Sequence, residues 1–257
     1  MGSIRLPKPY FQDDAVTIYH GDCREIMPLL DSASFSMLWS DPPYGHSNQD
    51  GDLQSARVGV KGARQRESIK IQNDGPEEMR EVVNFALTEA VRLLRNDCCC
   101  CCCCCGGGGP KPTFAWLAER MDKDGLSFFH ATIWDKTKRG PGLGWRYRRD
   151  YEMVMVAHKR GGKLAWNEEE GAVSNILRFR PEKNDLHPTM KPTSMVEQFL
   201  RVHTMPGDLV IDPFAGSGTT GRAAKDMGRK AVLIELEEKY CEIAAKRMSQ
   251  QVLNFGS

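Results

Sequence analysis

The chain has 257 residues, of which 27% are charged, and its formal net charge is +1. This length fits one large α/β domain with insertions or two small ones, and the balanced charge excludes the strongly basic proteins whose nucleic-acid partner is evident from net charge alone. Because no apolar run is long enough to span a bilayer and no signal-peptide core begins the chain, we expect no membrane partner.

Ten cysteines are present, and eight of them are consecutive, from Cys98 to Cys105. A disulfide framework needs spaced cysteines and a zinc site needs spacing such as C-x-x-C, so this run predicts neither disulfides nor a metal site. We interpret it as a buried strand in which cysteine acts as a small hydrophobic residue. A thiol run of this kind favours a reducing cytoplasm, and the purpose of the run stays open.

The first elements follow residues 1–15, which we expect to form a tail. The residues Val16–His20 are β-branched and aromatic and predict a strand. A short helix is expected over Cys23–Leu30, and a second strand over Ser34–Trp39 runs into Asp41-Pro42-Pro43-Tyr44-Gly45. Two prolines continue neither a ladder nor a helix, so they predict a stiff turn at the carboxyl end of a strand, where open α/β sheets bind ligands.

The middle of the chain begins with residues 46–71, which lack periodicity and predict a mobile loop. This loop is either a disordered insertion or a lid that closes over DNA. Pro76 opens a helix with acidic residues in its first turn and basic residues near its end, as the helix dipole favours. Another helix is expected over Thr113–Met121, and two strands over Phe128–Trp134 and Tyr151–His158.

Basic residues gather after the first of these strands, since Lys136 to Lys183 contain twelve Lys or Arg and six Asp or Glu. Trp145, Tyr147 and Trp166 lie among them. Basic side chains with interleaved aromatics suit phosphate contact and base stacking, so we predict a target-recognition region within residues 136–186. The alternative is an ordinary solvated surface.

A glycine-rich turn follows the strand predicted at Leu209–Asp212. Gly216, Gly218 and Gly221 fit G-x-G-x-x-G, which lets a ligand lie against bare backbone at a helix N-terminus. The next strand ends at Glu235, 19 residues after Gly216, where nucleotide-binding folds place an acid on ribose hydroxyls. Three helices are expected in this part of the chain, over residues 194–204, 219–227 and 239–250.

The turn at Asp41-Pro42-Pro43-Tyr44 offers a second kind of chemistry. Asp41 and the backbone carbonyl of Pro42 can each accept a hydrogen bond from one exocyclic amino group, which makes its nitrogen more nucleophilic without a strong base. Tyr44 offers an aromatic face to a base taken out of its stack.

These two motifs resemble the signature motifs of the amino-methylating DNA methyltransferases, which use S-adenosylmethionine to modify adenine N6 or cytosine N4. The catalytic motif comes first here, which resembles the permuted β group. The resemblance extends from about Val16 to Met248. It implies a Rossmann-like, circularly permuted α/β sheet of seven strands in a single catalytic domain over residues 1–257, with a small target-recognition insertion.

The resemblance also implies site residues. The catalytic residues would be Asp41, Pro42, Pro43 and Tyr44. Asp41 would also touch the cofactor, Glu235 would hold its ribose, Asp22 would lie near its adenine, and Lys191 and Thr189 would contact its carboxylate. The methionine part would lie in the turn formed by Asp212, Pro213, Phe214, Ala215, Gly216, Ser217, Gly218, Thr219 and Thr220.

The expected reaction is direct methyl transfer to adenine N6 in double-stranded DNA, with S-adenosylhomocysteine as the second product. In this family Asp before Pro-Pro-Tyr is usual for adenine and Ser is more typical for cytosine, so N4-cytosine methylation is the alternative. A dinucleotide oxidoreductase, a non-catalytic DNA-binding module, and RNA or protein glutamine methylation are rival hypotheses. A homodimer stays open, and the expected location is the cytoplasm of a bacterial, archaeal or phage-infected cell.

Overall fold

The structure is a computed structural model that describes residues 5–43, 75–96, 113–137, 151–180 and 190–250, together with the backbone of residues 100–105. Tyr44, Thr189 and the loop predicted at residues 46–71 lie outside the described residues. Residues 138–150 of the predicted recognition region also lie outside them.

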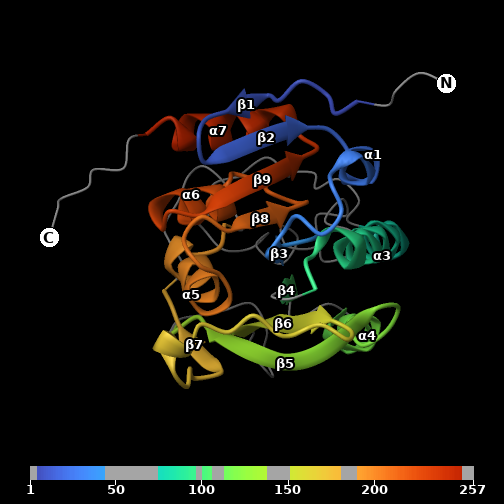
Figure 1. The fold of residues 1–257 in the computed structure, drawn as a ribbon, viewed down its shortest axis with the longest axis vertical. Helices are drawn as coiled ribbons and strands as arrows, with labels where there is room; N and C mark the ends of the chain where they lie inside the picture. The colour runs from blue at the N-terminus through green and yellow to red at the C-terminus, as the bar shows by residue number, and fades with distance from the viewer. Residues whose placement is uncertain are drawn as a thin grey trace, which may run out of the picture.

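The described strands form one sheet of nine strands in the order β1-β2-β9-β8-β3-β4-β6-β5-β7 (Figure 1). Strands β2, β9, β8, β3 and β4 are parallel to one another, and β6 is antiparallel to both β4 and β5. The strands are β1 (Phe11–Gln12), β2 (Val16–His20), β3 (Met37–Ser40), β4 (Cys100–Cys105), β5 (Leu126–Asp135), β6 (Tyr151–Lys159), β7 (Ile176–Arg178), β8 (Leu209–Asp212) and β9 (Lys230–Glu235).

The expectation of seven strands was wrong because two short edge strands extend the sheet. Strand β1 lies in residues 1–15, which were expected to form a tail, and it pairs antiparallel with β2. The carboxylate of Asp13 accepts hydrogen bonds from the backbone N–H groups of Ala15 and Val16, which folds the chain back and allows this pairing. At the other edge β7 pairs with β5. The seven strands between them include every strand that the sequence predicted.

Helices cover both faces of the sheet. One face carries α1 (Cys23–Ile26), the 3-10 turn η1 (Met27–Leu29), α3 (Pro76–Leu93) and α4 (Thr113–Arg120), and the other carries α5 (Thr193–His203), α6 (Thr219–Asp226) and α7 (Glu238–Met248). A 3-10 turn, η3 (Glu168–Glu170), lies between β6 and β7. No helix in the part of the chain that the structure describes has the length and apolar character needed to cross a membrane.

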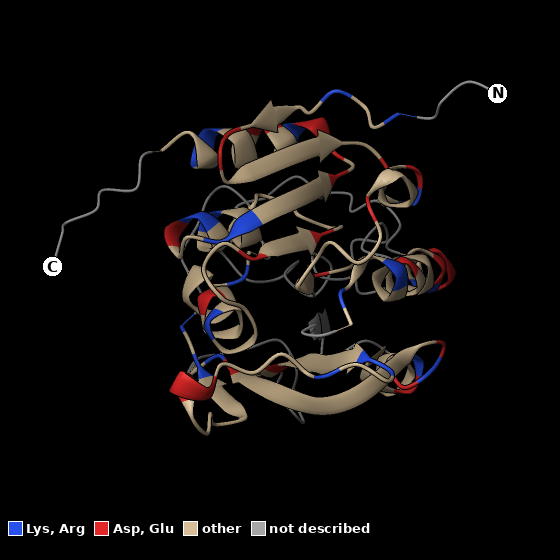
Figure 2. Cartoon of the chain, viewed as in Figure 1, with Lys and Arg blue, Asp and Glu red and all other residues tan. Residues whose placement is uncertain are grey.

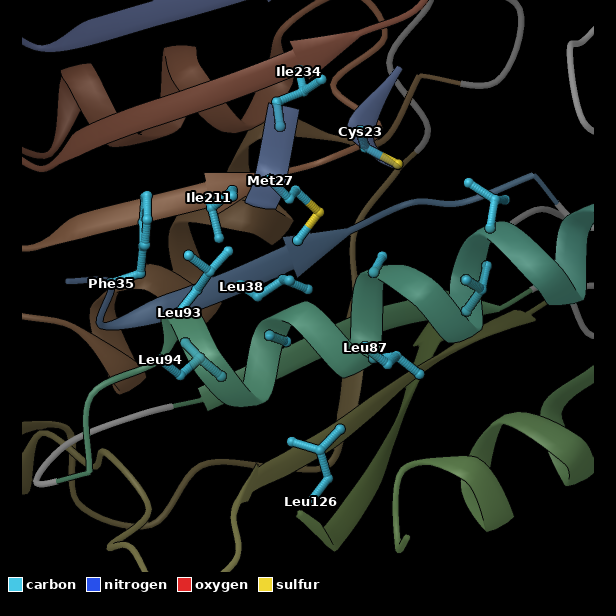
Figure 3. Close-up of a cluster of buried hydrophobic side chains, with 14 of the residues drawn as sticks. Cys23, Met27, Phe35, Leu38, Leu87, Leu93, Leu94, Leu126, Ile211 and Ile234 are labelled. Atoms are coloured by element: carbon cyan, nitrogen blue, oxygen red, sulfur yellow. The ribbon is translucent and has the colours of Figure 1, made fainter. Parts of the chain in front are cut away.

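Two apolar layers hold the helices to the sheet. Side chains alternate along each strand, so that Leu38 and Ile211 face α3, whereas Trp39 and Val210 face α5 to α7. Figure 3 shows the layer under α3, in which Leu87 and other side chains of the helix meet residues of β3, β8 and β9. Burial on both faces is what central parallel strands require.

The predicted strand in the cysteine run is confirmed over Cys100–Cys105, where it is an interior strand of the sheet, whereas the predicted burial of its side chains lies outside what the structure describes. Its backbone pairs parallel with β3 and antiparallel with β6. The direction of the sheet therefore reverses after β4, and β5 and β6 form the predicted hairpin.

Candidate active site

Four acidic residues lie along the carboxyl ends of four neighbouring parallel strands. Asp212 ends β8 opposite Leu233, so Glu235 at the end of β9 lies two positions further along. His20 is opposite Glu235, and Asp22 follows it by two residues. Asp41 comes directly after β3, which pairs with β8. The acidic residues at these strand ends are visible in Figure 2, and this edge is where such sheets bind ligands.

Asp212 is buried at the beginning of the glycine-rich turn and organises it. Its Oδ1 accepts a hydrogen bond from the backbone N–H of Phe214 at 3.0 Å, and its Oδ2 accepts one from the Thr220 hydroxyl at 2.5 Å. Burial, together with the smaller effect of the Asp41 and Glu235 charges, raises the pKa of Asp212 to about 7, although these two hydrogen bonds act to lower it. The carboxyl group thus ties the start of the turn to the first residues of α6.

Glu235 ties the same turn to the next strand. One oxygen accepts a hydrogen bond from the backbone N–H of Gly216 at 2.7 Å, and the other accepts one from the N–H of Glu237 at 2.8 Å. Burial raises the pKa of Glu235, although both N–H groups favour its ionised form. The predicted ribose acid therefore lies directly against the glycine turn.

The three glycines of the turn differ in what their lack of a side chain permits. Gly218 has φ +77°, and a Cβ there would lie 2.8 Å from the Cβ of Ala244 on α7. Gly221 packs so closely on β9 that its Cβ would lie 2.6 Å from Leu233 Cδ1. Gly216 has φ +51°, but a Cβ there would meet no described atom within 4 Å. Among the described residues the backbone at Gly216 is therefore uncovered, whereas Gly218 and Gly221 permit close packing.

Asp22 lies at the same edge, but its carboxylate already stabilises the first turn of α1. Its carboxylate accepts a hydrogen bond from the backbone N–H of Arg24 at 2.8 Å, which caps α1. Arg24 also forms a 2.6 Å ion pair with it. The neighbouring Gly21 N–H donates to the backbone carbonyl of Glu235 at 2.9 Å, so Asp22 and Glu235 are acidic ends of adjacent strands, as predicted.

Asp41 belongs to a cluster of two carboxylates and two ammonium groups. Lys191 Nζ donates a hydrogen bond to Asp41 Oδ2 at 2.8 Å and lies 3.3 Å from Glu152 Oε2. Lys136 Nζ donates to Glu152 Oε1 at 2.5 Å. The Lys191 side chain is only 5% exposed. Pro42 is buried and Pro43 is partly buried. The predicted catalytic turn is therefore linked to Lys191, a residue 150 positions away in the chain.

A family model described as DNA methylase, for N6 and N4 methyltransferases, matches residues 35–246 of this sequence. The chain belongs to this N6/N4 DNA methylase family. It is thus an amino-methylating DNA methyltransferase, and S-adenosylmethionine is the methyl donor in the family.

Two type II methyltransferases illustrate the similarity in sequence. M2.DpnII of Streptococcus pneumoniae is 25% identical over 268 residues, which cover 97% of this chain and 96% of that protein. M.HinfI of Haemophilus influenzae is 25% identical over 267 residues, which cover 95% of this chain and 71% of that protein.

Two solved structures share the fold. M1.HpyAVI in complex with SAM has a TM-score of 0.64 and 26% identity, covering 90% of this chain and 99% of that one. The cytosine-N4-specific PvuII DNA methyltransferase has a TM-score of 0.71 at 20% identity, covering 97% of this chain and 91% of that one. The Rossmann-like methyltransferase fold expected from the sequence is confirmed.

Three residues that contact the predicted site residues were not themselves predicted from the sequence to belong to the site. Glu152 and Lys136 join the cluster around Lys191. Arg247 on α7 donates a hydrogen bond to the backbone carbonyl of Ser217 at 2.8 Å, inside the glycine turn. For Glu152 alone, a signal for a functional role was present in the sequence, because it is an acid within an otherwise apolar strand pattern.

Two further features of the described residues lie outside the predicted site. Among the described residues, no group of three or more His, Cys, Asp or Glu side chains could hold a metal ion. A cavity of about 240 Å³ lies between β5, β7 and α5, and residues such as Trp166, Phe199 and His203 line it. It contains none of the residues predicted for the methylase site.

Proposed function

We propose that this chain transfers a methyl group from S-adenosylmethionine to the N6 amino group of adenine at specific sites in double-stranded DNA. The observation that carries the proposal is the position of Asp41-Pro42 directly after β3, a strand that pairs with β8, which leads into the glycine turn. A donor in that turn and a base at Asp41 would share one edge of the sheet. Tyr44, proposed to stack on the base, follows Pro43 in the sequence.

The cofactor would lie in the glycine turn from Phe214 to Thr220. Two observations support this fit: no described atom would meet a Cβ at Gly216, which leaves its backbone accessible to a ligand among the described residues, and Glu235 borders the same turn. Glu235 would hold the ribose, which requires its carboxylate to accept hydroxyl hydrogen bonds beside those from the backbone. Asp22 would lie near the adenine, and Lys191, with Thr189, would contact the carboxylate.

S-adenosylmethionine supplies an electrophilic methyl group when bound. Asp41 would accept a hydrogen bond from the target amino group while its Oδ2 accepts one from Lys191, because a carboxylate has about four acceptor sites. The Pro42 carbonyl would accept the second amino hydrogen. These two acceptors would orient the nitrogen and stabilise the positive charge that develops on it as the new N–C bond forms and the methyl–sulfur bond of the donor breaks. The methylated nitrogen would then release its extra proton to water.

The preference for adenine rests on Asp41, since an aspartate before Pro-Pro-Tyr is usual for adenine in the resembled family. N4-cytosine methylation is the second candidate. Digestion of methylated DNA to nucleosides followed by mass spectrometry separates the two. We expect N6-methyladenine, and N4-methylcytosine as the sole product would overturn the preference.

The same proposal covers the organisation of the protein. We propose that residues 1–257 form one catalytic domain, with the target-recognition region within residues 136–186. The type II methyltransferases of Streptococcus pneumoniae and Haemophilus influenzae support a role in restriction-modification, in the cytoplasm of a bacterial cell. Methylation-aware sequencing of DNA from cells that express the protein would report the recognition sequence.

A further inference from the structure

Glu152 lies near the beginning of β6, where it is opposite Trp134 of β5. Its side chain is 15% exposed, and each of its two oxygens is close to a different ammonium group. Lys136 Nζ is 2.5 Å from Oε1, and Lys191 Nζ is 3.3 Å from Oε2. In this position the negative charge of Glu152 stabilises the ammonium groups of both lysines.

The two lysines keep Glu152 ionised in this partly buried position. Burial acts to raise the pKa of its carboxyl group, but the charges of Lys191 and Lys136 outweigh it and hold the pKa below its usual value. Lys136 is itself fixed, since its ammonium lies 5.2 Å from the centre of the Trp134 ring. The Trp134 indole N–H donates to the backbone carbonyl of Phe179 at 2.8 Å.

Lys191 therefore lies between two carboxylates, at 2.8 Å from Asp41 and 3.3 Å from Glu152. Its side chain is 5% exposed, so water contributes little to holding the ammonium in place. Without the charge of Glu152, the ammonium would move toward Asp41 and neutralise it more completely. That shift would displace Lys191 from the cofactor and weaken Asp41 as an acceptor for the target amino group.

We propose that Glu152 is a positioning residue for methyl transfer, which shares the Lys191 ammonium with Asp41 and so fixes its place between the catalytic turn and the cofactor. This inference rests on the function proposed above. It assigns to strand β6 a part in the reaction that is separate from DNA recognition.

A double-mutant cycle tests the inference, because a residue that acts only through Lys191 loses its effect once Lys191 is removed. Glu152→Gln is combined with Lys191→Met, and kcat, KM for S-adenosylmethionine and the calorimetric Kd for S-adenosylmethionine are measured for all four proteins. We expect Glu152→Gln alone to lower kcat/KM and to weaken cofactor binding by about tenfold each. In the Lys191→Met background the same change should alter both by less than about twofold.

Further variants separate positioning from folding. Glu152→Asp keeps the charge and should restore part of the lost kcat/KM, whereas Glu119→Gln, which removes one partner of the exposed Lys123–Glu119 pair, should change nothing. Thermal unfolding checks that each variant is folded.

An equal loss in both Lys191 backgrounds, or full activity of Glu152→Gln, would overturn the inference while leaving the proposed function intact. If the unmodified protein labelled no DNA, the proposed function would fail, and the Kd cycle would still decide whether Glu152 acts through Lys191.

Discussion

Asp212 is fully enclosed at the end of β8, close to the carboxylates of Asp41 and Glu235. The negative charges of the other three acids at this edge are each stabilised by a different partner. Arg24 pairs with Asp22, Lys191 pairs with Asp41, and two backbone N–H groups donate to Glu235. Asp212 has no cationic partner among its recorded contacts, and its pKa of about 7 means that it carries a proton over much of the acidic range.

This raised pKa predicts how stability changes with pH. Between the ordinary carboxyl pKa and about 7, folded Asp212 keeps a proton that the unfolded chain releases, so its contribution is present at low pH and is lost as pH rises through about 7. The loss is about 1.4 kcal/mol per pH unit at most. Asp212→Asn removes this contribution, so the free energy of unfolding of the variant relative to the wild type should rise from pH 5 to pH 8. Urea unfolding measures it, and a constant difference would contradict the shift.

At the scale of elements, the glycine turn depends on three neighbours. It follows β8, it is tied to β9 through Glu235, and it is held from α7 by Arg247. Arg247 Nη1 lies 2.8 Å from the Ser217 carbonyl oxygen and 3.3 Å from the hydroxyl oxygens of Ser217 and Thr219. Helix α7 therefore fixes the backbone that would receive the cofactor.

Removal of this contact should weaken cofactor binding. A hydrogen bond to a charged donor contributes about 1.5 to 3 kcal/mol, so Arg247→Ala should raise the Kd for S-adenosylmethionine by about tenfold or more. Lys246→Ala is the matched control. The Lys246 side chain is next to Arg247 in the sequence, is 74% exposed, and forms its ion pair with Glu242 of the same helix. Calorimetry compares the two. Equal affinities of both variants would show that the turn does not need Arg247.

Many elements could be predicted because local patterns specify them. The strand at Val16–His20 has the predicted bounds, and α6 begins at Thr219, the predicted first residue of that helix. The helix expected over Cys23–Leu30 is divided instead into α1 and a 3-10 turn that contains Pro28. Strand β7 was not predicted, since it has three residues and only Leu177 of them is buried.

The arrangement of the candidate site could be predicted only where its residues form a local motif. Asp41, Asp212 and Glu235 end predicted strands, and the parallel sheet brings them to one edge. Glu152 and Arg247 could not be predicted in the same way, because their roles depend on contacts with residues that lie 39 and 30 positions away along the chain. Such contacts follow from the packing of elements and leave no fixed spacing in the sequence.

For the whole molecule, the strand order explains why the catalytic motif can precede the cofactor motif. β3 and β8 are neighbours in the sheet although about two thirds of the chain separates them, so the chain order is permuted while the site stays whole. The net charge of +1 leaves DNA binding to local basic regions, of which the predicted recognition region is the proposed example.

This proposal predicts a strong salt dependence. Phosphate contacts release counterions from DNA, so affinity for duplex DNA should fall by more than about tenfold between about 50 and 200 mM salt. The Kd for S-adenosylmethionine over the same range should change much less and serves as the control. Fluorescence anisotropy with a labelled duplex measures the effect, and a salt-independent DNA affinity would argue against phosphate contacts.

The most direct measurement compares transfer of a labelled methyl group from S-adenosylmethionine to duplex DNA by the wild type, Asp41→Ala and the exposed control Asp31→Ala. Loss of a group that stabilises charge in the transition state typically lowers rates by about 100-fold or more. We expect the wild type and Asp31→Ala to label DNA at the same rate and Asp41→Ala to lose at least about that factor while remaining folded. An Asp41→Ala variant that methylates DNA as fast as the wild type would contradict the account.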